Sequence, residues 1–382
     1  MSQQTSTFPL EFELTPSETA RTRAARETIL SDPGFGRHFT DHMVTIDWTI
    51  EEGWHSARVT PYGPLQLDPA SSVLHYGQEI FEGMKAYRHA DGSIWTFRPD
   101  KNAERLQRSA RRLALPELPV ADFIESIRQM VAVDGDWVPS APETSLYLRP
   151  FMIANESFLG VRAAHKVGYY VIASPAGAYF TDGVAPVSIW LSTEYSRAGR
   201  GGTGAAKCGG NYAASLLPQQ EAYDNGCAQV LFLDGETGTH IDELGGMNVF
   251  FVHGTDTLVT PRLTGTILEG VTRDSIMQLA RDRGMTVSER DVTVDEWRDG
   301  VASGSITEVF ACGTAAVVTP IAQLKGKGFT IGDAAAPAGE ITMALRQELT
   351  DIQYGRLPDR HGWLMRLDAQ PLDGAADGEA TA

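Results

Sequence analysis

Apolar residues recur along the first half of the chain with the periods of both strands and helices. Alternation predicts strands, and the predicted strands cover residues 35–48, 54–61, 93–97, 144–150 and 167–174. Asp91-Gly92 marks a hairpin turn just before one of them. Helical spacing predicts helices over 17–30, 100–115 and 122–134. We expect Pro116 to end the second of these helices.

The second half of the chain carries the same two periods. Predicted strands cover residues 227–233, 249–253 and 306–312, and predicted helices cover 211–225, 268–284 and 294–300. Gly226 and Gly284 are placed to stop two of these helices. Strands and helices thus mix along the whole chain, which predicts an α/β protein of the α+β type.

The length of 382 residues is enough for two domains. We expect a smaller N-terminal domain over 1–174, a connection rich in Gly and Pro over 175–185, and a larger C-terminal domain over 186–367. The tail over 368–382 is mostly Ala, Gly and Asp without periodicity, and it is predicted to be disordered.

Charge and cysteine content narrow the class of function. The chain has 32 basic and 49 acidic residues, a net charge of −17, which argues against nucleic acid and anionic membranes as partners. Its cysteines, Cys208, Cys227 and Cys312, are too few and too scattered for a disulfide framework or a zinc site. We therefore expect a cytoplasmic protein with no metal site.

Lys207 lies in a run of small residues from Gly199 to Tyr212. With only alanines, glycines and a cysteine beside it, its ammonium should be partly desolvated, which favours the neutral amine that forms a Schiff base with an aldehyde. A glycine-rich surface loop with an incidental lysine is the alternative. The Walker A pattern is absent, and the spacing matches a dinucleotide-binding fingerprint poorly.

From about residue 35 to residue 356, the sequence resembles the branched-chain amino acid aminotransferases, pyridoxal phosphate enzymes of fold type IV. Two stretches carry the resemblance, namely 202–212 around Lys207 and 243–250, which is continued by Thr260 and 268–273. The resemblance implies two domains with the cofactor between them, and a homodimer with the site near its interface. It also implies transamination between Leu, Ile or Val and 2-oxoglutarate, giving 2-oxo acids and glutamate, through a Schiff base on Lys207.

The resemblance also implies which residues hold pyridoxal 5′-phosphate. Arg105 would bind the phosphate, and its guanidinium fork suits that task. Main-chain groups of Val271 and Thr272 at a helix start, together with Thr314, would complete the phosphate site. Tyr212 would bond the ring hydroxyl, and Glu243 would keep the ring nitrogen protonated.

Substrate contacts follow from the same resemblance. The residues implied are Phe35, Tyr76, Phe81 and Tyr147 as aromatic walls, Arg149 for the distal carboxylate, and the Ala315 amide for the α-carboxylate. Each aromatic residue could instead be ordinary core. Lys85 is the rival Schiff-base lysine, ranked below Lys207.

Other functions stay open at this point. A D-amino acid aminotransferase or an aminodeoxychorismate lyase of the same fold type is one alternative. A phosphate-binding protein without catalytic activity is another, although it would leave Lys207 and Glu243 without a role.

Overall fold

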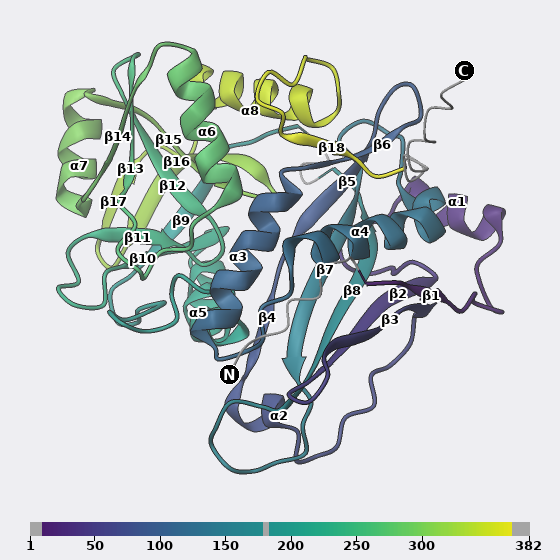
Figure 1. Cartoon of the computed structure of the whole chain (residues 1–382). Coiled ribbons are helices and arrows are strands. Elements are labelled where there is room, and N and C mark those ends of the chain that lie inside the picture. Colours follow the sequence, from purple (N-terminus) through teal and green to yellow (C-terminus); the bar gives the residue numbers. More distant parts are fainter. Residues whose placement is uncertain (1–9, 179–182, 369–382) are drawn as a thin grey trace, which may run out of the picture.

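The computed structural model describes residues 10–178 and 183–368 (Figure 1). The elements of the first half are β1 (Glu13–Leu14), α1 (Arg23–Ser31), β2 (His42–Thr49), β3 (Gly53–Pro61), α2 (Ser72–Tyr76), β4 (Glu79–Phe81), β5 (Met84–Arg88), β6 (Ile94–Phe97), α3 (Pro99–Arg112), α4 (Val120–Asp134), β7 (Ser145–Ala154) and β8 (Lys166–Ala176). A short 3-10 turn, Gly135–Trp137, follows α4.

The second half contributes a similar mixture. Its elements are β9 (Val187–Ser192), α5 (Gly209–Asp224), β10 (Gln229–Leu233), β11 (Ile241–Leu244), β12 (Asn248–His253), β13 (Thr257–Pro261), α6 (Val271–Asp282), β14 (Thr286–Arg290), α7 (Val294–Ser303), β15 (Ile306–Gly313), β16 (Val317–Gly326), β17 (Phe329–Gly332), α8 (Glu340–Gln353) and β18 (Leu364–Arg366). The predicted mixed α/β character is confirmed.

The strands form two separate nine-stranded sheets. The first runs β1-β3-β2-β8-β7-β5-β6-β18, with β4 beside β7, and the second runs β11-β10-β9-β16-β15-β12-β13-β14, with β17 beside β16. Helix α3 lies where the two halves meet (Figure 1), and Arg112 near its end donates to the carbonyls of Gly201 and Gly202 in the second half.

The last strand departs from chain order. β18 pairs with β6 of the first sheet, and Leu367 just after it is buried in the first core. The first sheet is thus completed by the end of the chain. The expected division into domains stays a prediction. Residues 179–182 of the expected connection, and all of the expected tail except Asp368, lie outside the described residues.

Several predicted boundaries are wrong, each for a local reason. The strand expected over 35–48 begins only at His42, because Gly34 and Gly36 adopt positive φ values of 61° and 68° and turn the chain. The helix expected over 100–115 ends at Arg112, before Pro116, and Ala114 already has a positive φ of 54°. The helix expected from residue 268 begins at Val271, after Gly270 as its N-cap.

The helix expected over 17–30 is also displaced. It begins at Arg23, where the Thr22 side chain accepts a hydrogen bond from the Ala25 amide and so caps the first turn. Residues 17–21, the expected first turn, take no helical form.

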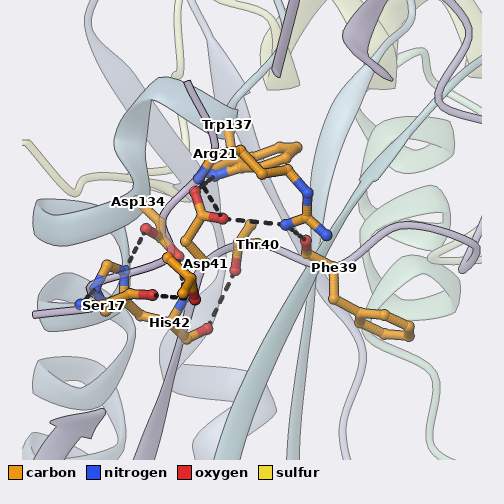
Figure 2. A network of polar contacts seen from close by, with 9 residues as sticks. Ser17, Arg21, Phe39, Thr40, Asp41, His42, Asp134 and Trp137 are labelled. Carbon is orange, nitrogen blue, oxygen red and sulfur yellow. Dashed lines mark hydrogen bonds and ion pairs between the residues drawn. The ribbon is translucent and has the colours of Figure 1, made fainter. Parts of the chain in front are cut away.

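Residues 21–41, which include α1 and the irregular chain after it, form a segment called here the strap, whose two ends are joined by an ion pair. The Arg21 guanidinium lies 3.0 Å from the Asp41 carboxylate, which also accepts from the Trp137 indole at 2.9 Å. The next residue, His42, bonds Asp134 of α4 at 2.8 Å. The network includes Ser17, Arg21, Phe39, Thr40, Asp41, His42, Asp134 and Trp137 (Figure 2).

Among the described residues, no helix combines the length and the apolar character that crossing a bilayer requires.

Candidate active site

A cavity of about 220 Å³ lies between the two sheets and is lined by residues of both halves. Every site residue expected from the sequence lines it, except Tyr76. Those that line it are Phe35, Phe81, Arg105, Tyr147, Arg149, Lys207, Tyr212, Glu243, Val271, Thr272, Thr314 and Ala315. Residues far apart in sequence are thus brought together around one space.

Lys207 lies in the turn before α5 and is the lysine that reaches this cavity. Its Nζ is 2.6 Å from the Tyr212 hydroxyl and 4.7 Å from the centre of the Phe81 ring. The first half holds its backbone, because the Lys207 amide donates to Ser109 Oγ and its carbonyl accepts from the Phe81 amide. The rival Lys85 does not line the cavity.

Glu243 is buried in the cavity wall and forms an ion pair with one arginine. Arg197 Nη1 lies 2.8 Å from its Oε1, which also accepts from the Leu268 amide at 2.9 Å. Burial raises the pKa of Glu243 to about 7, and Arg197 works against that rise. The sequence argument missed Arg197, whose only signal was an arginine just ahead of the small residues that lead to Lys207.

Arg105 meets an acid that the sequence argument also missed. Its Nε and Nη2 both lie 2.8 Å from the carboxylate of Glu82, which is completely buried between β4 and β5. Burial alone would raise the pKa of Glu82, but Arg105 holds it below its usual value. The guanidinium of Arg105 was expected to give two parallel hydrogen bonds to a phosphate, but it gives them to Glu82. Nη1 donates to the Glu269 carbonyl at 3.1 Å.

The start of α6 suits an anion. Gly270 is its N-cap, no side chain caps it, and Val271 and Thr272 bring their amides to the cavity wall. A Cβ on Gly270 would come within 2.1 Å of Asn248 Oδ1, so this approach requires glycine. Thr314 adds a hydroxyl from the turn after β15.

The first sheet supplies the remaining wall. Tyr147 and Arg149 lie two apart on β7 and share a face, as expected. The edge of the Phe35 ring meets Tyr147 with centroids 5.1 Å apart. A Cβ on Gly83 would lie 2.1 Å from the Tyr147 hydroxyl, so glycine is required there for the phenol to cross the strand.

Arg149 is a cation without an acid. In the described part of the chain it makes no ion pair, and its buried Nε has no hydrogen-bond partner. Its guanidinium lies 4.8 Å above Phe81 and donates to the Tyr147 hydroxyl at 3.2 Å. A carboxylate that entered the cavity would find this cation available.

Tyr76 lies outside the cavity. It is at the end of α2, is 43% exposed, and donates its hydroxyl to the Leu159 carbonyl. Leu74, Tyr76, Leu159 and Val161 form an exposed group of side chains, called here the apolar patch.

Comparison with known proteins agrees with this geometry. Residues 79–324 match the model of the amino-transferase class IV family. The branched-chain-amino-acid aminotransferase of Mycolicibacterium smegmatis is 60% identical over 366 residues, covering 94% of this chain and 99% of the relative. The corresponding enzyme 2 of Bacillus subtilis is 46% identical, covering 88% and 92%.

Solved structures give the same answer. The Escherichia coli branched-chain amino acid aminotransferase superposes with a TM-score of 0.69 at 27% identity, over 84% of this chain and 99% of that one. The Thermobaculum terrenum enzyme in its PLP-form gives 0.68 at 25% identity, over 84% and 98%. The chain therefore belongs to the class IV aminotransferases. Within that family its relatives are the branched-chain-amino-acid aminotransferases, which have the two-domain fold of type IV.

Proposed function

We propose that this enzyme exchanges amino groups between L-leucine, L-isoleucine or L-valine and 2-oxoglutarate, using pyridoxal 5′-phosphate held on Lys207. One observation carries the proposal: an amine at Lys207, a buried acid at Glu243 and an unpaired cation at Arg149 face a single cavity. The relatives' names support branched-chain substrates over those of a D-amino acid aminotransferase or an aminodeoxychorismate lyase.

The residues present fit the proposed cofactor. Glu243 is a buried carboxylate able to hold a proton on a ring nitrogen, and Tyr212 is within reach of Lys207 Nζ. The amides of Val271 and Thr272, the Thr314 hydroxyl and the outer face of Arg105 would hold the phosphate. When bound, the cofactor supplies an aldehyde and an electron sink that makes the substrate Cα proton acidic.

The protein's own groups then position the substrate and carry the proton. Once the substrate amine has displaced it from the cofactor, Lys207 Nζ would take the proton from the substrate Cα and give it to the aldehyde-derived carbon of the cofactor. Its tether beside the substrate gives it an effective molarity of about 10⁵ M or more. Tyr212, at 2.6 Å, orients that amine. The Ala315 amide would receive the α-carboxylate.

The cavity can accept both branched-chain and acidic substrates because its wall has apolar surface and a positive charge. Phe35, Phe81 and Tyr147 offer apolar surface to a branched side chain, whereas Arg149 offers a charge to the distal carboxylate of glutamate. A single methylene changes binding by only about 1–3 kcal/mol, so all three branched-chain amino acids should be accepted.

We also propose a cytoplasmic homodimer in which Tyr76 reaches the cavity of the other copy. The apolar patch includes Val161 at 85% exposure and Leu159 at 60%, and such a cluster is costly in water. Burying the patch against a second copy would explain both the exposure and the distance of Tyr76 from its own cavity. Val161→Asp should convert a dimer to a monomer in light scattering, whereas an unchanged mass would reject this interface.

The decisive experiment is the visible absorption of the purified holoenzyme during half-reactions. L-leucine should bleach the absorption band of the bound cofactor at the violet end of the visible range, and 2-oxoglutarate should restore that band. Lys207→Ala should abolish this cycle, and Lys101→Ala, at an exposed lysine of α3, should leave it intact. If only a D-amino acid bleaches the band, the substrate proposal fails.

A further inference from the structure

Lys85 is a partly buried cation that the catalytic steps above do not use. It lies on β5 opposite Tyr147 of β7, so its side chain leaves the same face of the first sheet. Its Nζ donates to the Ala315 carbonyl at 2.9 Å, and among the described residues it has no acid within ion-pair distance. A buried charge without a counter-ion is costly, so an anion close by would offset that cost.

The surroundings of Lys85 leave its charge uncompensated. Arg346 of α8 lies nearby, but Glu143 binds it through two bonds of 3.1 and 2.8 Å. That pair is neutral, and Lys85 is the net positive group. It borders a second cavity of about 430 Å³, which shares Ala315 and Phe35 with the main one. Lys85 therefore contacts Ala315 from the second cavity, while Ala315 also lines the main one.

We propose that Lys85 is a positioning residue for the substrate α-carboxylate: it fixes the Ala315 carbonyl and adds a positive charge behind the amide that receives the carboxylate. This inference rests on the proposed function, because it takes the Ala315 amide as the carboxylate site. The proposal also gives different roles to the two cations, Lys85 and Arg149. Lys85 serves the α-carboxylate that every substrate carries, and Arg149 serves only the distal carboxylate of glutamate and 2-oxoglutarate.

The test compares a charged ligand with a neutral one. 4-Methylvaleric acid has the side chain and carboxylate of leucine without its amine, and 4-methylvaleramide lacks the charge. Calorimetric titration of the holoenzyme should show the acid binding about tenfold or more weakly to Lys85→Met than to wild type, with amide binding unchanged. Lys85→Gln, which can still bond the Ala315 carbonyl, should recover only part of the loss.

Kinetics and pH give independent readings. Lys85→Met should raise the KM for leucine and the KM for 2-oxoglutarate alike. Arg149→Met should raise the KM for 2-oxoglutarate alone. Burial, with Arg346 adding to it, lowers the pKa of Lys85 to about 8, so wild-type affinity for the acid should fall as pH rises above 8. The variant should lack that fall. The charged or titratable groups around Lys85 are Glu143, Arg346, Tyr87, Tyr147, Arg149 and Tyr354.

Two outcomes would overturn the proposal. One is unchanged acid binding in Lys85→Met; the other is an equal loss for acid and amide, which a purely structural role would give. Lys101→Met controls for removal of a lysine elsewhere. The wild-type enzyme is assayed with leucine before any variant is compared. If it does not transaminate leucine, the proposed function is wrong, and the role of Lys85 is not what that result tests.

Discussion

Individual site residues are defined by the partners that restrain them. Glu243 would be an unpaired buried acid without Arg197, and Arg105 would be an unpaired buried cation without Glu82. Each pair joins residues well separated along the chain. Charge at this site is therefore set by contacts as much as by the side chains themselves.

Arg197→Met tests the link between the first of these pairs and catalysis. Without its cation, the pKa of Glu243, already raised by burial, rises further, and the carboxylate form persists only at higher pH. We expect kcat at neutral pH to fall by about tenfold or more. The acid limb of the kcat–pH profile should move to higher pH.

The matched control is Arg200→Met, because the Arg200 side chain is 81% exposed. Its profile should overlay that of wild type. An unshifted acid limb in Arg197→Met would mean that Arg197 does not govern the ionisation of Glu243.

At the scale of elements, the strap places an aromatic ring that no regular element carries. Phe35 lies between two left-handed glycines, and the Gly34 carbonyl accepts from the Gly177 amide at 2.8 Å. The far ends of the strap are joined by Arg21 and Asp41 (Figure 2). We infer that this joint helps to hold Phe35 against Tyr147.

Arg21→Met should therefore weaken binding of branched side chains. The Arg21 side chain is 40% exposed, so the loss should be modest, about 1 kcal/mol or about fivefold in KM for leucine, with kcat little changed. The sharper measurement is a double-mutant cycle with Phe35→Ala.

If the joint acts through Phe35, the two effects should not add. Additive effects would show that Arg21 influences the cavity by another route. Arg23→Met, at an 84% exposed arginine of α1, should have no effect on KM.

The sequence predicted elements well where apolar residues kept one period over a long stretch. It failed where the end of an element depends on the backbone conformation of a single residue. The spacing of Ala103, Leu106 and Ala110 indicated α3 well, since all three are buried. The end of α3 was misplaced because a proline is a visible stop signal, whereas the positive φ of Ala114 is not.

The candidate site shows the same division. Lys207 was marked by the small residues around it, and it lines the cavity with Tyr212 of the same stretch. The other expected residues that line the cavity were indicated by the resemblance to a family, not by local pattern alone. Glu82 and Arg197 were missed because each matters only through a partner far away in sequence, and a single sequence does not reveal such pairs. Tyr76 was expected in the wall, yet within one chain it lies on the surface.

At the scale of the whole molecule, Arg98 ties three regions together. It precedes α3, donates to Ser275 at 2.8 Å, pairs with Asp274 of α6 at 2.7 Å, and lies 5.1 Å over the Trp363 ring near the end of the chain. This buried guanidinium thus adds a link between the halves that form the cavity, beside the contacts of Arg105 and Arg112.

Arg98→Met should lower the free energy of unfolding by about 1–3 kcal/mol, because the Ser275 and Asp274 bonds are lost while Asp274 remains largely in water. Urea denaturation followed by tryptophan fluorescence measures this. Arg281→Met, at an exposed arginine of α6, is the control, and equal stabilities for the two variants would contradict the role given to Arg98.

The pairing of Arg105 with Glu82 has a consequence for how the enzyme acquires its cofactor. Because Glu82 cancels the charge of Arg105, the proposed phosphate site would exert little long-range attraction, while the net charge of −17 repels a phosphate dianion. Added salt screens that repulsion over a Debye length of about 10 Å at 0.1 M. Moderate ionic strength should therefore speed the capture of pyridoxal phosphate by the apoenzyme, the reverse of what an open cationic site would do.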